Sequence, residues 1–519
     1  MKSVRAVVAI WLLAYPGYSQ DSLVYIKDLQ FSSPYEQKAI KTFLQTRKPD
    51  FFDLFMATGN LLTEPVIAQH KERLEVYLKE FADEKFMVKK NDKKARHIYE
   101  DVHKTFLQKY EYQNRFEEIF YNGRYNCVSA SALYGIVFEK TAIPYVIKEK
   151  PTHVYLIAYP DAERIMVETT SPVGGVFSIS PAFKQNYVRV LKEQKIISAK
   201  EYAAEDPDLL FDKYYFGNQE NISLLNLVGI QYMNDALYKL EDKNYEGAVQ
   251  QLEKAYLFYP SDRCGYLLMY SNIQVLESHK AKDLKHAAVI SKLSRFHAYG
   301  ITSEIIQSEF HQVTNELLFV NTNVPALEAY YKYISEAVKD STISNEITFQ
   351  YQYERGRFLY NRAHYQEALP YFENALQLKP NNEEINNILI ATLAQSLDVE
   401  SDNLQSIKTL RSYGDKYPSL ENNNIFNSMY ATALLIQFGR EYNFNRATEG
   451  DKFKAEFEAH RKKFPDLSIN SNLIGQSYST AAVYFFRKGQ TAKAKSILVK
   501  GLEYAPGNYE LQVRQQMIK

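Results

Sequence analysis

Three side chains in the first third of the chain have the types and the order that thiol chemistry needs. Cys127 stands in RYNCVSASALYG (124–135), and His153 and Glu168 follow downstream. A cysteine becomes a nucleophile when a base takes its proton, and the base works best when a third group orients its other nitrogen. The three residues therefore predict a Cys–His–acid site that attacks amide or ester carbonyls.

Each of these residues has a definite step in such a reaction. The Cys127 thiolate would attack the carbonyl carbon, and His153, held by Glu168, would protonate the leaving amine. Water or a second amine would then release the acyl group, so hydrolysis and acyl transfer both remain open. The backbone N–H of Cys127 and one upstream donor would hold the oxyanion. The candidates for that donor are Gln108, Gln113, Tyr125 and Asn126.

The small residues after Cys127 predict a helix that begins at the cysteine. Its first N–H groups and the positive end of its dipole would then face the sulfur and favour the thiolate. Ser129 and Ser131 are expected to let this helix pack closely. Apolar residues every four positions predict an earlier helix that Gly123 caps. They are Ile98, Val102, Phe106 and Tyr110.

After this helix the apolar pattern changes to a period of two, which predicts strands at 142–149, 153–159 and 164–170. PDAE (160–163) is the expected hairpin turn. A turn centred on 161–162 pairs Tyr155 with Glu168 and His153 with Thr170. His153 and Glu168 would then be diagonal neighbours on one face, with Cα atoms roughly 7–8 Å apart.

These segments carry a family resemblance. NCVSASALY, followed by THVYLIAY and VETTSP, resembles the transglutaminase-like superfamily over about residues 95 to 180. The resemblance implies a papain-like fold, with Cys127 as nucleophile, His153 as general base and Glu168 as orienting acid. Two positions depart from the family pattern, which usually has Asp in place of Glu168 and Trp in place of Tyr155.

A repeat appears beyond residue 225, where no strand is predicted. ERGRFLYNRAHYQEALPYFENALQLKPNN (354–382) has small and aromatic residues at the offsets of the 34-residue tetratricopeptide repeat, and the segments around 245–260 and 478–506 fit the same frame. The resemblance implies stacked helix hairpins, because each pair buries its outer face only against its neighbours. We expect a right-handed α-solenoid of six to eight hairpins that binds a protein or peptide partner.

The overall charge excludes one class of partner, and the N-terminus indicates export. Lys and Arg together number 62, as do Asp and Glu, so the chain lacks the basic footprint that nucleic acid requires. MKSVRAVVAIWLLAYPGYSQ has the charged start, short apolar run and small residues of a signal peptide. The apolar run is too short to span a bilayer. We therefore expect a periplasmic or extracellular protein whose mature chain has no membrane span.

The chain has two cysteines, Cys127 and Cys264, and the sequence leaves open whether they pair. The histidines are scattered without metal-ligand spacing, so we expect neither a metal nor a cofactor.

The fold class predicted is a mostly helical chain, in which an α+β papain/transglutaminase-like domain precedes an all-α tetratricopeptide-repeat solenoid. The predicted boundaries are a signal peptide at 1–19, an N-terminal helical region at 20–94, the transglutaminase-like domain at 95–200, a linker at 201–224 and the repeats at 225–519. The leading hypothesis is an exported thiol hydrolase or acyltransferase acting on amide bonds of peptides. The alternatives are a non-catalytic repeat adaptor with a degenerate transglutaminase-like domain, and a scaffold in envelope assembly.

Overall fold

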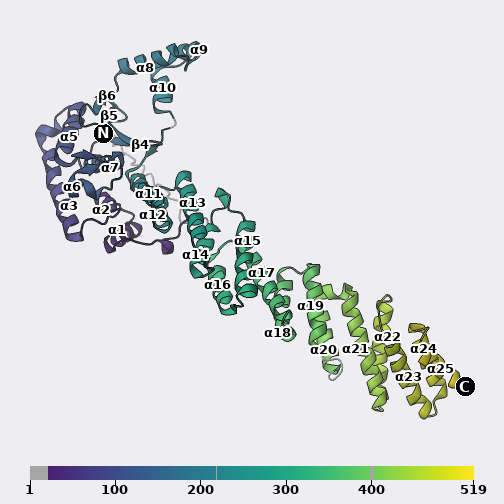
Figure 1. Ribbon diagram of the computed structural model, residues 1–519. Helices are drawn as coiled ribbons and strands as arrows, with labels where there is room; N and C mark the ends of the chain where they lie inside the picture. The colour runs from purple at the N-terminus through teal and green to yellow at the C-terminus, as the bar shows by residue number, and fades with distance from the viewer. Residues whose placement is uncertain (1–21, 218, 398–402, 519) are drawn as a thin grey trace, which may run out of the picture. The chain divides into compact units, whose positions relative to one another are not determined.

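A computed structural model describes residues 22–217, 219–397 and 403–518 (Figure 1). The predicted signal peptide at 1–19 lies outside these residues. The chain divides into two compact units. The first contains the residues up to 281 and 285–302, and the second contains 282–284 and the residues from 303 onward. The two units are described separately.

The first unit begins with helices whose starts are set by capping side chains. Ser33 accepts a hydrogen bond from the Glu36 N–H at the start of the first helix, and Asp50 accepts one from the Asp53 N–H at the second. The helices are α1 (Pro34–Thr46), α2 (Phe51–Met56), α3 (Glu64–Leu78), α4 (Glu84–Met87), α5 (Asn91–Phe106) and α6 (Glu117–Asn122). Gly123 ends α6 in the left-handed conformation, with φ 74°, so it is a helix cap, but of α6 and not of the longer helix that was predicted.

The predicted helix with apolar residues every four positions corresponds only in part to α5. Ile98, Val102 and Phe106 are buried on one face of the helix. The helix ends at Phe106, however, and Tyr110 belongs to β1 (Lys109–Tyr110), which pairs in parallel with β2 (Arg124–Tyr125).

An antiparallel sheet of five strands follows, in the order β6-β5-β4-β3-β7. Its strands are β3 (Tyr145–Lys150), β4 (His153–Ala158), β5 (Ile165–Val167), β6 (Val176–Ser178) and β7 (Asn221–Ile222). Leu156 pairs with Val167 and Ala158 with Ile165, which is the register that the predicted turn implied. The paired residues end at Leu156 and Val167, and Tyr155 and Glu168 are the next residues along the two segments.

Helix α7 (Cys127–Lys140) packs against β4, and every residue from Val128 to Phe138 is buried. A helix that is apolar on all sides must be covered on all sides, and the sheet and neighbouring helices provide that cover. A separate cluster packs Tyr155, Ile157 and Met166 of the sheet against residues of the following helices. Side chains alternate between the two faces of β4, so one face packs in this cluster while the strand also packs against α7.

Residues 201–224, predicted as a linker, are folded. They lie within a set of short elements, α8 (Pro181–Glu193), α9 (Ala199–Ala204), α10 (Pro207–Phe211), a π-helical turn (Asp212–Phe216) and β7. Leu210 and Phe211 are fully buried in the cluster with Tyr155. The linker prediction was wrong because Leu210 and Phe211 are buried against residues of the sheet, a contact that no local sequence pattern indicates.

The first unit also contains four further helices, α11 (Leu224–Glu241), α12 (Tyr245–Phe258), α13 (Asp262–Ser278) and α14 (Leu284–Leu293). Helix α11 approaches α7 closely at Gly135, where a Cβ would lie 2.7 Å from Leu224 Cδ1. Lys254 of α12 donates a 2.7 Å hydrogen bond to Glu36 of α1, and this ion pair is buried. Helices α11 and α12, although they begin at residue 224 or later, are thus integral to the first unit.

The second unit is helical throughout its described residues. Its α-helices are α15 (Ser303–Thr314), α16 (Val324–Ala337), α17 (Ser341–Tyr360), α18 (Tyr365–Leu378), α19 (Glu383–Ser396), α20 (Asn403–Lys416), α21 (Asn424–Asn443), α22 (Ala447–Lys463), α23 (Ser471–Arg487), α24 (Thr491–Tyr504) and α25 (Tyr509–Met517). Most of them follow one another as antiparallel neighbours, as Figure 1 shows.

Small residues set the distance between paired helices. A Cβ on Gly356 would lie 2.7 Å from the Phe372 ring, and one on Gly501 would lie 2.8 Å from Tyr478 Cβ. Among the described residues, the most extensive consecutive helix pairs are α11/α12, α17/α18, α21/α22 and α23/α24. Three of these contain the predicted repeat frames. The expected six to eight hairpins include irregular ones, and π-helical and 3-10 turns do interrupt α13 to α16 and α20 to α21.

Candidate functional site

Cys127 occupies the first position of α7, and the local sequence fixes that position. The Asn126 side chain accepts hydrogen bonds from the N–H groups of Val128 (3.0 Å) and Ser129 (2.9 Å), and Ser129 Oγ accepts one from the Asn126 N–H (2.9 Å). This reciprocal capping box fixes Cys127 as the residue at which the helix begins. The half-exposed sulfur therefore sits at the helix N-terminus, as predicted.

His153 and Glu168 come together as the register requires. His153 is the first residue of β4, and Glu168 directly follows β5. His153 Nε2 lies 2.9 Å from Glu168 Oε2 and 3.0 Å from Oε1. Thr170 holds the carboxylate from its other side, because its Oγ1 donates to Oε1 at 2.8 Å and its N–H at 3.3 Å. The carboxylate is thus fixed in position behind the imidazole.

The imidazole also contacts the thiol. A hydrogen bond with Cys127, followed by one with Glu168, raises the pKa of His153 to about 9 against the opposing effect of burial. Since Nε2 faces the carboxylate, Nδ1 is the nitrogen that remains for the sulfur. Burial tends to raise the pKa of Glu168, but the hydrogen bonds from His153 and Thr170 outweigh it and hold that pKa below its usual value. The arrangement favours a positively charged imidazole beside the anionic Glu168 carboxylate.

Ser131 ties the cysteine helix to both strands. Its Oγ lies 3.2 Å from Thr169 Oγ1 and 3.5 Å from the Val154 carbonyl oxygen, and its side chain is fully buried. Val154 and Thr169 are the chain neighbours of His153 and Glu168. One hydroxyl therefore links the element that carries the thiol to the elements that carry the base and the acid.

Tyr99 supports the acid from behind. Its Oη donates to the Glu168 carbonyl oxygen at 2.9 Å, and the Glu168 N–H donates to the Gly175 carbonyl at 2.8 Å. A Cβ on Gly175 would lie 2.1 Å from Tyr99 Oη and 2.6 Å from the Glu168 carbonyl oxygen. Glycine is required here because the chain after Glu168 passes too close to Tyr99 for any side chain.

Aromatic rings flank the site. The Tyr155 ring stacks on His153, with centroids 6.3 Å apart and an interplanar angle of 18°, and its Oη donates to Gln219 Oε1 at 2.6 Å. On the cysteine side, Tyr110 and Tyr112 are exposed. Burial, with the nearby charge of Cys127, raises the pKa of Tyr110. These rings give the surroundings of the thiol an apolar character.

Two of the four predicted oxyanion donors, Asn126 and Gln113, use their side chains elsewhere, whereas the exposed side chain of Gln108 stays a candidate. Asn126 uses its side chain as a cap, and its Nδ2 donates to the Tyr112 carbonyl oxygen at 3.1 Å. Gln113 Nε2 donates to Glu241 Oε2 at 3.1 Å. Tyr125 is buried, and Gln108 packs beside Gly123. The N–H of Cys127, which as the first helical residue has no intrahelical acceptor, remains as a donor.

Sequence reasoning missed several residues that support the site, namely Tyr99, Asn114, Thr170 and Gly175. Only Thr170 carried a usable signal, because the predicted register already placed it opposite His153. Tyr99 contacts Glu168 across 69 positions of the chain, and no sequence pattern assigned Asn114 or Gly175 to the site.

The structure contains no disulfide between the two cysteines. Cys127 and Cys264 are both free, and Cys264 is buried with its pKa raised to about 12 by that burial. Among residues 22–217, 219–397 and 403–518, no group of three or more His, Cys, Asp and Glu side chains could hold a metal ion. The same residues include no helix long and apolar enough to cross a bilayer.

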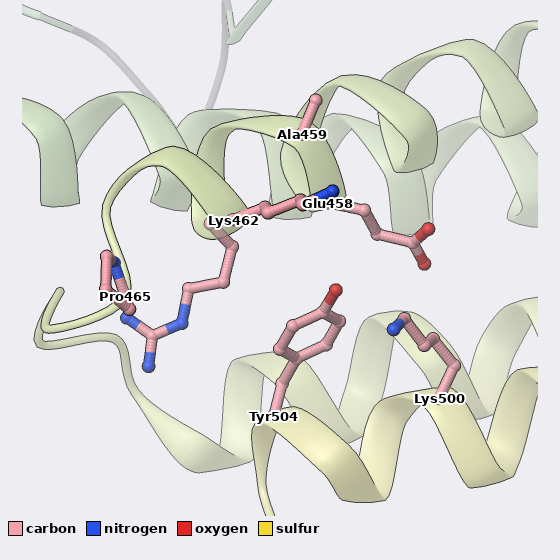
Figure 2. Close-up of a pocket in the computed structure, with 7 residues that line it drawn as sticks. Glu458, Ala459, Lys462, Pro465, Lys500 and Tyr504 are labelled. Carbon is pink, nitrogen blue, oxygen red and sulfur yellow. The ribbon is translucent and has the colours of Figure 1, made fainter.

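A cavity of about 470 Å³ lies in the second unit between α22 and α24. Figure 2 shows Glu458 from α22 and Tyr504 and Lys500 from α24 converging on it. Its polar groups have internal partners: Tyr478 Oη donates to Glu458 Oε1 at 2.9 Å, and Lys500 Nζ donates to Glu503 Oε2 at 2.5 Å. The cavity has none of the three residues of the candidate site.

Comparison with known proteins bears on the repeats. The tetratricopeptide repeat family model matches residues 349–382, which span most of α17 and α18, so a tetratricopeptide repeat is present there. The repeat suggests a role in protein binding. A search of the curated proteins finds no match.

One similar solved structure is a complex of Naa15/Naa10 bound to HypK-THB. The identity is 13%, and the alignment covers 65% of this chain and 60% of the other, with a TM-score of 0.16. The chain thus spans less than two thirds of the length of that protein.

Proposed function

We propose that this chain is an exported, transglutaminase-like thiol enzyme that cleaves or transfers amide bonds of peptides, and that its repeats bind a protein partner. One observation carries the proposal: His153 Nε2 lies 2.9 Å from the Glu168 carboxylate, and the imidazole interacts with the Cys127 side chain, which raises the pKa of His153. A nucleophile, a base and an orienting acid in one hydrogen-bonded chain are the requirement for covalent acyl chemistry. Export rests on the sequence of residues 1–19 alone.

The reaction follows from the positions of the three groups. Cys127 Sγ bonds to the carbonyl carbon, whose oxygen becomes an anion beside the Cys127 N–H. The C–N bond then breaks, and the leaving amine takes the proton from His153. A water molecule attacks the thioester and gives one proton to His153, and the acid leaves as Sγ departs as thiolate. If an amine replaces water, the same steps produce a new amide.

A peptide substrate suits the surroundings of the sulfur. Tyr110 is 47% exposed and Tyr112 is 70% exposed, so both rings offer flat surfaces beside the nucleophile. Tyrosine rings bind extended chains through apolar contact while their hydroxyls stay hydrated. The half-exposed site is open to a polypeptide.

A thiol-directed probe tests the proposal. We expect iodoacetamide to label Cys127 at pH 7, as mapped by mass spectrometry, and we expect His153→Ala to slow that labelling at least about 100-fold. His364→Ala is the matched control, because His364 also pairs with a glutamate, Glu367, at 3.0 Å but lies in the second unit. Labelling of Cys127 that needs alkaline pH in the wild type, or that is unaffected by His153→Ala, would contradict the proposal.

A non-catalytic adaptor is the second candidate, and the repeat match at 349–382 favours it. In that case the repeats would bind their partner, and the first unit would only recognise amide-bearing ligands. The two candidates differ in one measurement. The enzyme forms a thioester with a p-nitrophenyl ester at Cys127 and releases nitrophenolate in a burst, whereas the adaptor shows no burst.

A further inference from the structure

The segment 111–116 supports the start of the cysteine helix. Asn126, the cap of α7, donates through Nδ2 to the Tyr112 carbonyl oxygen at 3.1 Å. Ser129 Oγ, the other half of the capping box, donates to Asn114 Oδ1 at 2.6 Å. The side chains that fix the position of Cys127 are therefore themselves fixed by this segment.

Helix α11 holds that segment in turn. Arg115 Nε donates to Asp235 Oδ1 at 2.8 Å, and Arg115 Nη2 contacts the same oxygen. Tyr238 Oη donates to the Tyr112 carbonyl oxygen at 3.0 Å, and Gln231 Nε2 donates to the Asn114 carbonyl oxygen at 3.3 Å. We call these contacts of α11 with residues 112–115 the α11 clamp.

Asp235 is the charged centre of the α11 clamp. Its side chain is 2% exposed, whereas that of Arg115 is 30% exposed. A buried carboxylate depends on its partner, and loss of the charge at Asp235 would release the Arg115 side chain toward solvent. Every contact of the clamp ends on a residue that touches Asn126 or Ser129, or on its immediate neighbour.

We infer that Asp235 is a positioning residue for Cys127, acting through Arg115, the segment 112–115 and the capping box; the inference rests on the proposed function for its consequence in catalysis. Helix α11 pairs with α12, which carries the first predicted repeat frame. The helical hairpin α11/α12, which begins the repeat region, thus helps to position the Cys127 thiol.

Two variants test this inference in the full-length chain. In Asp235→Asn we expect the iodoacetamide labelling rate of Cys127 at pH 7 to fall about tenfold and its pH profile to shift to higher pH. We also expect amide hydrogen exchange of a peptide covering 111–130 to become about tenfold faster. Asp28→Asn is the matched control, because Asp28, whose side chain is 14% exposed, also pairs with an arginine of the first unit, Arg295, at 2.5 Å. That variant should leave both readouts unchanged.

The outcomes separate the two proposals. If exchange in 111–130 is unchanged in Asp235→Asn, or rises equally in Asp28→Asn, the positioning role is overturned. Faster exchange confined to Asp235→Asn, in a chain whose wild-type Cys127 labels only at alkaline pH, supports the positioning role and contradicts the proposed function. A slower labelling rate with wild-type exchange would also overturn the inference, because the clamp acts only by holding the backbone.

Discussion

The candidate site and the repeats of the second unit depend on contacts of different range. Cys127, His153 and Glu168 lie on three elements, and residues as distant in the chain as Tyr99 and Asp235 support them. In the second unit the principal contacts join consecutive helices, as between Gly356 and Phe372. A change in a repeat should therefore stay local, whereas a change at any support of the site should reach the thiol.

The largest effect is expected from removal of the nucleophile. Cys127→Ser should lower amide cleavage at least about 1,000-fold, because the hydroxyl is a far weaker nucleophile in a site built for a thiolate. Cleavage is measured as release of a fluorescent amine from a peptide amide. Cys264→Ser should retain wild-type cleavage, because Cys264 is buried away from the site. Equal losses in both variants would place the chemistry elsewhere.

Removal of the charge on the orienting acid should have the next largest effect. Glu168→Gln should lower cleavage about 100-fold, because a neutral amide cannot stabilise the imidazolium that forms at His153. Glu168→Asp, the residue usual in the resembled family, should retain more activity than Glu168→Gln. In the second unit, Glu367→Gln removes the partner of His364 and should change nothing. An active Glu168→Gln variant would show that the carboxylate is only structural.

The pH dependence should follow His153. Its pKa is raised to about 9, so the imidazolium is present below that pH and is lost above it. Where amine departure limits the rate, cleavage should fall about tenfold per pH unit above pH 9, because the proton donor is lost. The contribution of His153 to stability has the same sign: it is fully present below the ordinary pKa of about 6.5 and is lost through pH 9. Cleavage that still rises at pH 10 would exclude His153 as the acid.

The smallest effect is expected from a repeat position. Gly356→Ala places a Cβ 2.7 Å from the Phe372 ring, so the free energy of unfolding of the second unit should fall by about 1 kcal/mol. Urea unfolding followed by circular dichroism measures that change. Gly507→Ala, where no atom lies within 4 Å of the added Cβ, should leave stability unchanged. Both variants should label at Cys127 like the wild type, and a slower rate in either would break the contrast between the two regions.

Sequence patterns anticipated those parts of the molecule that local rules determine. The turn at 160–163 fixed the register of β4 and β5, and with it the approach of His153 to Glu168. The small residues after Cys127 predicted a helix that begins at the cysteine, and α7 does begin there. Small residues at repeat offsets located the hairpin α17/α18, which the family match confirms. In each case the decisive contacts lie within a few tens of residues.

The remaining features depend on contacts between distant segments. Tyr110 continues the apolar spacing of α5, yet it joins β1, because β1 pairs with β2 across an intervening helix. Residues 201–224 appeared to be a linker, but Phe211 is buried against the cluster of Tyr155. The clamp between Arg115 and Asp235 spans 120 positions of the chain. No local pattern carries information about such pairs.

The two thiols differ in solvent exposure, so their reactivity reports whether the first unit is folded. Cys127 is partly exposed to solvent, whereas Cys264 is buried within the first unit, where its thiol donates to the Leu252 carbonyl oxygen. A chromogenic disulfide reagent should therefore count one sulfur per native chain and two per denatured chain. Intermediate values would report the fraction of molecules whose first unit has opened, without any added label or engineered reporter.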